Sequence, residues 1–186
     1  MPDQAADATD HLDALTERLR AIIRDVPDFP RAGILFKDIT TLLQDAGAYH
    51  EAIDRLAGAW SDARVDVVAG VESRGFVIGG ALAYLLGAGF VPVRKAGRLP
   101  SEKIALSYSL EYGEAELEIH TDAVAPGQRV LVVDDLLATG GTVTAAIELV
   151  RRLGGDVVGV AFLVELAFLG GAERLGPVPR VSLVTF

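Results

Sequence analysis

The sequence predicts an α/β fold, in which a mainly parallel twisted sheet is flanked by helices and carries an inserted antiparallel hairpin and a flexible loop. From residue 65 onward, short apolar runs alternate with segments of helical periodicity. Such alternation is characteristic of a parallel sheet covered on both faces. Between residues 105 and 122 the pattern changes to two runs in which polar and apolar residues alternate, which is typical of a hairpin.

The length and the N-terminus set the limits of that fold. Residues 1–10 are acidic and lack an apolar run, so we expect them to be disordered and not to form a signal peptide. The remaining residues, 11–186, suffice for a single domain, which at this size buries about 70% of the surface that its unfolded chain exposes.

Two helices are expected before the sheet begins. Apolar residues recur at helical spacing from Leu12 to Val26, which predicts an amphipathic helix that ends before Pro27. A segment with proline and glycine, Pro27 to Thr41, separates it from a second helix. One stripe of the second helix carries the apolar residues Tyr49, Ile53, Leu56 and Trp60.

The alternating part of the chain supplies the sheet. The expected strands are Val65–Val71, Phe90–Arg94, Arg129–Asp134, Val157–Val164 and Arg180–Phe186. The expected helices between them are Gly75–Leu86 and Thr142–Leu153. The insertion is expected to pair Leu106–Tyr112 with Ala115–Thr121, and the polar residues Ala96 to Ile104 are expected to form the flexible loop before it.

Composition excludes several classes of function. The 17 basic and 26 acidic residues give a net charge of −9 without a basic stretch, so no nucleic-acid partner is expected. The absence of cysteine excludes disulfides and thiol catalysis, and the 3 histidines lack zinc spacing, so no dedicated metal site is expected. The uncharged stretch Gly75–Val93 contains five glycines and a proline. It divides into a helix and a strand, so we expect no membrane span and a cytoplasmic protein.

The segment Val130–Thr142 carries the strongest functional signal. Four apolar residues that suit a buried strand are followed by Asp134 and Asp135, then by a turn of small residues and a helical pattern. The turn reads Ala138, Thr139, Gly140, Gly141 and Thr142. Such a turn before a helix presents free N–H groups and a positive dipole end to a phosphate. Adjacent carboxylates suit sugar hydroxyls or a hydrated Mg2+, so the expected ligand carries a phosphate and a polyol.

Spacing excludes other readings of this segment. Gly140-Gly141 is not part of a Gly-x-Gly-x-x-Gly fingerprint, and no Gly-x4-Gly-Lys-Ser/Thr motif occurs. A receiver-type domain also places paired acids after a strand, but too few residues follow Asp135 for the rest of such a sheet.

Three motifs are expected to meet at one edge of the sheet. Ligands of an open parallel sheet bind beyond the carboxyl ends of its strands. Glu72-Ser73-Arg74-Gly75, Arg94-Lys95 and Asp134-Asp135 all follow predicted strands. The chain therefore concentrates cations and carboxylates at one site although its net charge is negative.

The segment Asp134–Thr142 closely resembles the phosphoribosyl pyrophosphate motif of the type I phosphoribosyltransferase family, in the version of its adenine phosphoribosyltransferases. The resemblance covers nearly the whole chain from Pro27. Its other anchors are Asp28-Phe29-Pro30, Gly33 to Thr40, Glu72 to Phe76, Arg94-Lys95, Ser107 to Gly113 and Leu163 to Leu166. It implies the type I fold and an enzyme of purine salvage, a glycosyltransferase that moves the 5-phosphoribosyl group from phosphoribosyl pyrophosphate to adenine and gives AMP and pyrophosphate.

The resemblance also implies how this substrate binds. Residues 138–142 hold the 5′-phosphate, and Asp134 and Asp135 hold the ribose hydroxyls. Arg74 binds the pyrophosphate, with Mg2+ bridging the oxygens of that group, and the loop from Ala96 closes over the substrate. Further contacts to pyrophosphate, some of them across a homodimer interface, come from the residues that match Arg94, Lys95 and Arg98.

The base site is inferred from the resemblance alone. Family members use a glutamate that matches Glu111, here beside Tyr112, to exchange a proton at purine N7 while N9 attacks. Adenine lies between a residue that matches Leu166 and a segment that includes Leu35 and Lys37. Some relatives have arginine in place of Lys37, and lysine stacks less well on a planar base.

Two alternatives to adenine transfer stay open. The same fold could transfer the group to hypoxanthine, guanine or xanthine. A non-catalytic regulator could sense phosphoribosyl pyrophosphate with the same motif. Such regulators need an effector module, and the extra N-terminal segment is one acidic helix, which is a poor DNA-binding element.

Overall fold

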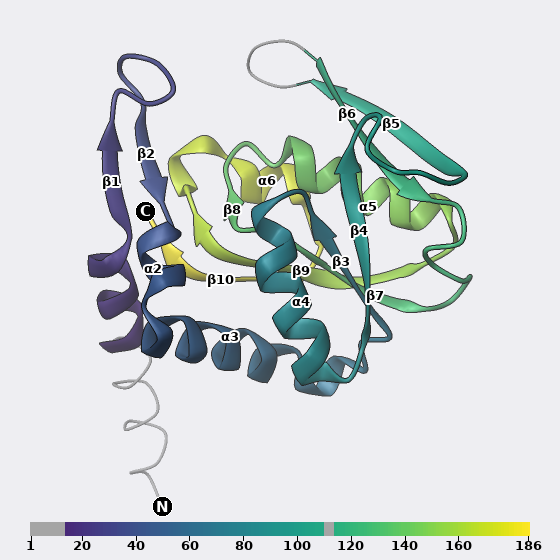
Figure 1. The fold of residues 1–186 in the computed structure, drawn as a ribbon, viewed down its shortest axis with the longest axis horizontal. Helices are drawn as coiled ribbons and strands as arrows, with labels where there is room; N and C mark the ends of the chain where they lie inside the picture. Colours follow the sequence, from purple (N-terminus) through teal and green to yellow (C-terminus); the bar gives the residue numbers. More distant parts are fainter. Residues whose placement is uncertain (1–13, 110–113) are drawn as a thin grey trace, which may run out of the picture. The chain divides into compact units, whose positions relative to one another are not determined.

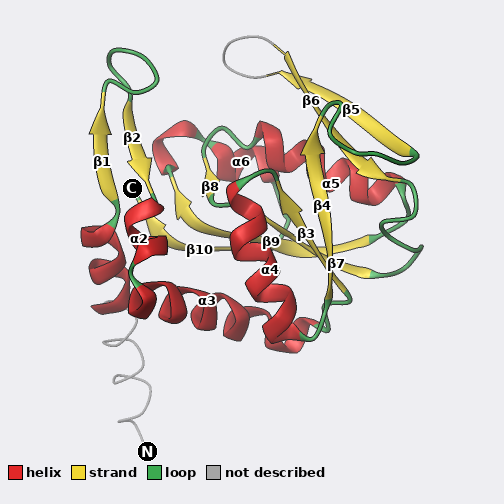
Figure 2. Ribbon diagram, viewed as in Figure 1, coloured by secondary structure: helices red, strands yellow, loops and turns green. Residues whose placement is uncertain are grey.

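The structure is a computed structural model that describes residues 14–109 and 114–186. The chain divides into two compact units, Met1–Asp54 and Arg55–Phe186. Figure 1 traces the chain through both units, and Figure 2 shows the helices and strands of each. Among the described residues, no helix is long and apolar enough to cross a membrane.

The first unit combines a small hairpin with helices. Residues 14–22 are helical. The chain then forms β1 (Arg24–Pro27), which pairs antiparallel with β2 (Leu35–Asp38), followed by α2 (Thr40–Gln44) and α3 (Ala46–Trp60). α3 begins in the first unit and ends in the second.

The predicted helix Leu12–Val26 is correct over residues 14–22 and wrong from Arg24 onward, and its first two residues lie outside the described part of the chain. Val26 pairs with Phe36 in the hairpin, and the Arg24 guanidinium binds the Asp38 carboxylate. Two hydrogen bonds from Arg24 and one from the Thr40 amide lower the pKa of Asp38 to about 2. This segment forms a strand because a partner strand lies later in the chain, and helical spacing alone does not reveal such a partner.

The second unit contains the main sheet. Its strands are β3 (Val67–Val71), β4 (Gly89–Lys95), β5 (Lys103–Ser109), β6 (Glu114–His120), β7 (Arg129–Val133), β8 (Leu136–Leu137), β9 (Asp156–Glu165) and β10 (Arg180–Thr185). They lie in the order β10-β9-β7-β3-β4-β6-β5, with β8 beside β9. The pairs from β10 to β4 are parallel, whereas β6 pairs antiparallel with both β4 and β5.

Helices pack on both faces of this sheet. α4 (Arg74–Leu86) and α5 (Gly141–Arg152) follow β3 and β8, and η1 (Ser61–Ala63), η2 (Ala167–Leu169) and α6 (Gly171–Leu175) are short. Alternate residues of β3 such as Val67 and Ala69 join the buried cluster that contains the apolar side of α5. Val68, from the other face, lies beside Gly79 of α4. The strands are therefore buried on both sides, as their continuous apolar runs predict.

The parallel strands, the two helices and the hairpin confirm the predicted fold class. The loop is shorter than predicted, because Lys103 and Ile104 pair with β6 and belong to β5. β8 and α6 were not predicted, since each is too short for a periodic pattern. The expected disorder of residues 1–10 lies outside the described residues, and a single domain over residues 11–186 stays a prediction.

Candidate active site

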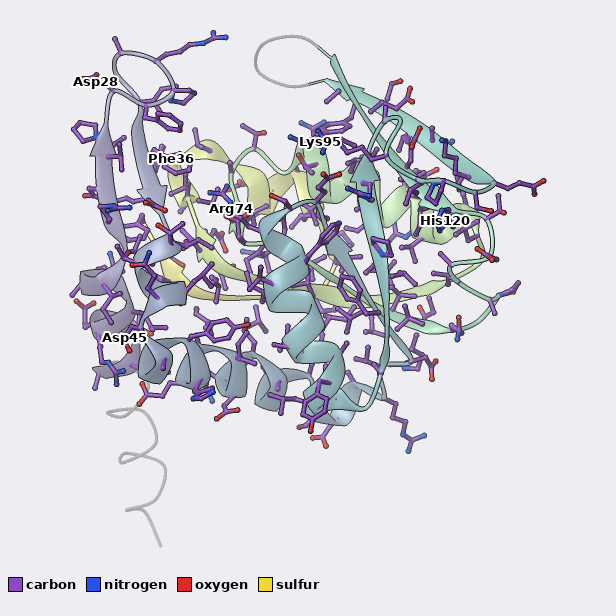
Figure 3. All side chains as sticks on the ribbon, in the orientation of Figure 1. Asp28, Phe36, Asp45, Arg74, Lys95 and His120 are labelled. Carbon is purple, nitrogen blue, oxygen red and sulfur yellow. The ribbon has the colours of Figure 1, made fainter. Side chains whose placement is uncertain are left out.

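The carboxyl ends of β3, β4 and β7 surround one cavity of about 540 Å³. Figure 3 labels Arg74 at the start of α4 and Lys95 at the end of β4. The lining residues are Glu72, Ser73, Arg74, Lys95, Tyr108, Ala115, Leu117, Asp134, Asp135, Leu136 and Thr142. The three motifs expected at one edge of the sheet therefore meet there.

A glycine at the start of α4 makes this approach possible. A β-carbon at Gly75 would lie 2.7 Å from the carbonyl oxygen of Val133 and 3.2 Å from Oδ1 of Asp134. Any other residue would push α4 away from the end of β7. Gly75 thus keeps the preceding residue, Arg74, against the carboxylates that follow β7.

Asp134 and Asp135 form a carboxylate pair at the end of β7. Asp135 is 5% exposed, and its Oδ2 lies 2.8 Å from Nε of Arg74, an ion pair without the alignment of a hydrogen bond. Oδ1 of Asp134 accepts a hydrogen bond from the Asp135 amide at 2.9 Å. Burial raises the pKa of both carboxyls. The Asp135 charge raises that of Asp134 further, whereas Arg74 opposes the rise at Asp135.

A smaller hollow of about 70 Å³ lies at the N-terminus of α5. Its lining consists of Asp134, Leu136, Leu137, Ala138, Thr139, Gly140, Gly141, Thr142 and Val143. Gly140 caps α5 with a φ of 78°, a left-handed conformation that glycine adopts without strain. The N–H groups of the first helical turn have no partner within a helix and carry the positive end of its dipole. This hollow is suited to an anion such as a phosphate.

Two contacts support the turn around this hollow. A β-carbon at Gly171, the first residue of α6, would lie 2.2 Å from the carbonyl oxygen of Ala138. α6 therefore packs directly against the backbone of the turn. The hydroxyl of Thr142 donates to the hydroxyl of Tyr108 at 3.2 Å, which links the start of α5 to β5.

Cations gather at the end of β4 around a buried carboxylate. The Glu72 side chain is 8% exposed and pairs with Arg94 at 3.3 Å and with Arg98 at 3.1 Å. Burial alone would raise the pKa of Glu72, but hydrogen bonds from Arg94 and the Lys95 amide and the charges of both arginines lower it. These cations are Arg94 and Lys95 of β4 and Arg98 of the loop, and of the three it is Lys95 that lines the large cavity.

The predicted base-site residues belong to elements of both units. Leu35 is 49% exposed on β2 of the first unit, and Lys37, also on β2, is buried with its Nζ 2.6 Å from Oδ1 of Asp25. Leu166 follows β9, is buried, and donates its amide to the Leu137 carbonyl at 2.9 Å. Glu111 and Tyr112 lie outside the described residues.

The sequence analysis assigned no individual role to Glu72 or to Tyr108. The contact between Glu72 and Arg94 could have been predicted from the register of β3 and β4. Val71 lies opposite Val93, and the residues that follow them, Glu72 and Arg94, carry opposite charges. Tyr108 reaches the site through a hydrogen bond across elements, for which the sequence carries no local signal.

The site suits a metal ion that is held mainly by its substrate. The described residues contain no group of three or more histidine, cysteine, aspartate or glutamate side chains that could hold a metal ion. Asp134 and Asp135 supply two carboxylates to the cavity, and Arg74 engages the second. Mg2+ commonly retains water and substrate oxygens beside one or two carboxylates, so this donor set fits Mg2+ bound with a pyrophosphate.

Known proteins share both the sequence and the fold. The phosphoribosyl transferase domain family matches residues 40–175. An adenine phosphoribosyltransferase from Geotalea daltonii is 57% identical over 171 residues, which cover 91% of this chain and 99% of that protein. The crystal structure of adenine phosphoribosyltransferase from Thermoanaerobacter pseudethanolicus is 52% identical with a TM-score of 0.89, and covers 92% of this chain and 99% of its own.

A more distant structure carries ligands. The adenine phosphoribosyltransferase from Saccharomyces cerevisiae, complexed with D-2,5-dideoxy-2,5-imino-altritol 1,6-bisphosphate and adenine, is 39% identical with a TM-score of 0.86. The match covers 92% of this chain and 99% of that one. This chain therefore belongs to the phosphoribosyl transferase family and, within it, to the adenine phosphoribosyltransferases.

Proposed function

We propose that this chain transfers the 5-phosphoribosyl group from phosphoribosyl pyrophosphate to adenine and releases AMP and pyrophosphate. The observation that carries the proposal is the convergence of three groups at the strand ends: a carboxylate pair, a glycine-capped helix N-terminus and a set of cations. These groups match the polyol, the phosphate and the pyrophosphate of one substrate. The complex of the yeast relative with a bisphosphate and adenine supports the proposal.

The phosphoribosyl part of the substrate has two matching subsites. Residues 138–142 hold the 5′-phosphate with the amides at the start of α5 and the hydroxyls of Thr139 and Thr142. Asp134, which lines both cavities, and Asp135, which lines the larger one, accept hydrogen bonds from the ribose hydroxyls. Their charge also favours the positive charge that develops on the ring as the bond from C1 to pyrophosphate breaks.

The leaving group is a polyanion and meets the cationic side of the cavity. Arg74 and Lys95 line that side and bind pyrophosphate oxygens directly. Arg94 and Arg98 form ion pairs with Glu72, so they bind pyrophosphate only after these ion pairs break. Mg2+ bound to the pyrophosphate neutralises part of its charge and so makes it a better leaving group.

The acceptor is a purine nitrogen, which forms its bond to C1 as the bond to pyrophosphate breaks. Glu111, which has Tyr112 beside it in the sequence, accepts the proton that adenine carries on N7 while the lone pair of N9 forms the bond to C1. Leu35, Lys37 and Leu166 hold the base. The backbone near Leu35 accepts from the exocyclic amine of adenine and repels the carbonyl of hypoxanthine or guanine. Sites that select by such hydrogen bonds reject the wrong base by about 10⁴.

We also propose a homodimer, because the family match implies that cations near Arg94 serve a neighbouring site. Light scattering at working concentration should give about twice the 19.6 kDa of one chain. A mass near that of a single chain would contradict the dimer and leave the reaction untouched.

The reaction is tested by incubating the protein with adenine, phosphoribosyl pyrophosphate and Mg2+ and measuring AMP. Asp135→Asn should lower turnover by about 10²–10³, the usual effect of removing one preorganised electrostatic group. The fold should persist, because Arg74, which no longer faces the Asp135 charge in this variant, is 38% exposed. AMP formation at the wild-type rate by Asp135→Asn would remove the ribose subsite from this position.

A further inference from the structure

We infer that Glu72 is a positioning residue that anchors residues 95–98, of which Lys95 lines the cavity, through Arg94 and Arg98. The inference deepens the proposed function, on which its kinetic consequences rest. Its structural part stands on the contacts of Glu72 alone. According to this inference, the buried carboxylate of Glu72 determines how the cations on this side of the site are arranged.

Glu72 lies where the end of β3 meets the end of β4. Its amide donates to the Val93 carbonyl at 2.9 Å, which continues the parallel pairing of the two strands. Oε1 accepts from Nη2 of Arg94 at 3.4 Å and from Nη1 of Arg98 at 3.1 Å. Oε2 accepts from Nε of Arg94 at 3.3 Å and from the Lys95 amide at 3.1 Å. Each carboxylate oxygen thus holds two donors, which come from β4 and from the loop.

Arg94 extends this anchor into the loop. Its Nη1 donates to the Arg98 carbonyl at 2.8 Å, so all three nitrogens of the guanidinium are engaged. Arg94 lies opposite Glu118 on β6, whereas Lys95 lies opposite Leu117, which lines the cavity. Because opposite residues of paired strands share a face, Lys95 faces the cavity and Arg94 faces away from it. Arg94 in this conformation therefore fastens the loop.

A second anchor holds the far end of the loop independently of Glu72. Leu99 is 6% exposed, and its carbonyl accepts from Nζ of Lys103 at 3.1 Å. Nζ of Lys103 also lies 3.6 Å from Oε2 of Glu118, a residue that is 4% exposed. Loss of the Glu72 charge should therefore loosen residues 95–98 and leave the segment near Leu99 in place.

The direct test is Glu72→Gln, which keeps the size of the side chain and removes its charge. Hydrogen–deuterium exchange of residues 95–98 should accelerate by about tenfold or more, because charge-assisted hydrogen bonds are lost. With substrate, the KM for phosphoribosyl pyrophosphate should rise about tenfold while the KM for adenine and kcat change little. A merely structural role would lower activity without this split.

Asp122→Asn is the matched control, since it removes one negative charge from an exposed residue in the turn after β6. It should change neither loop exchange nor the KM for phosphoribosyl pyrophosphate. Arg98→Gln probes the same anchor from a side chain that is 57% exposed, so it should fold even if Glu72→Gln does not. It should accelerate exchange of residues 95–98 as well.

The two substitutions combined decide whether the residues act as a unit. If Arg98 acts through Glu72, the double variant should have a KM close to that of the worse single variant. Additive losses, or unchanged exchange in both single variants, would overturn the inference. A lower KM in Glu72→Gln would also overturn it, because Glu72 would then compete with pyrophosphate for the arginines. Loop exchange is measured without substrate, so a protein that makes no AMP would refute the proposed function and leave the anchor to be judged by exchange.

Discussion

The contact between α6 and residues 138–142, the turn proposed to bind the 5′-phosphate and called the phosphate turn below, gives a prediction that can be worked out from distances. In Gly171→Ala, the new methyl group would lie 2.2 Å from the Ala138 carbonyl oxygen and 2.9 Å from Cδ1 of Leu137. Contacts of this kind are comfortable near 3.5 Å, so the turn must move by about 1 Å. Overpacking of a buried position costs about 1–3 kcal/mol. For a chain of this size, that lowers Tm by roughly 2–4 °C per kcal/mol.

The same displacement should be visible in catalysis. A shift of about 1 Å in a substrate-positioning group can cost about 10² in rate, so kcat/KM for phosphoribosyl pyrophosphate should fall by about that factor in Gly171→Ala. The control is Gly58→Ala in α3, where a β-carbon meets nothing within 4 Å. It should add about 0.5–1 kcal/mol of stability and leave activity unchanged. Wild-type kcat/KM in Gly171→Ala would refute the idea that α6 supports the phosphate subsite.

Three further predictions concern single carboxylates. The folded-state pKa of Asp134 is raised by burial and by Asp135, so its ionisation costs stability at every pH above the ordinary carboxyl range. Asp134→Asn should therefore raise the thermal midpoint at pH 7 while it lowers turnover, and an unchanged or lower midpoint would contradict this. Asp38 has its pKa lowered from 3.8 to about 2, so it contributes stability at neutral pH that is lost as the pH falls from about 4 to about 2. Acid titration of Asp38→Asn should show a smaller loss of stability over that interval, and a curve parallel to the wild type would argue against the pairing with Arg24. Glu111→Gln should lower kcat with adenine by about 10²–10⁴ and leave phosphoribosyl pyrophosphate binding by calorimetry intact, whereas equal losses in both would place Glu111 outside the base site.

Much of the second unit could be predicted because its signals are local. Strands such as Val67–Val71 and Arg129–Val133 are continuous apolar runs, as expected of strands buried on both faces. The segment Asp134–Thr142 holds both carboxylates and the phosphate turn in one stretch of sequence. Chain order alone therefore brings these groups together.

Other features depend on partners that the sequence does not reveal. Arg24–Pro27 is a strand because it pairs with Leu35–Asp38, although its apolar residues continue a helical spacing. The role of Glu72 comes from two arginines that lie 22 and 26 residues later in the chain. The support of the phosphate turn by Gly171 likewise depends on how closely two backbones approach, which composition does not encode.

The central claim is tested most directly by a single incubation of the protein with Mg2+, phosphoribosyl pyrophosphate and equal amounts of adenine, hypoxanthine, guanine and xanthine. Separation of the products should give AMP and pyrophosphate in equal amounts, with the other nucleotides lower by about 10⁴. IMP, GMP or XMP in amounts similar to AMP would contradict the adenine assignment. Binding of phosphoribosyl pyrophosphate without formation of any nucleotide would contradict the enzyme and favour a sensor.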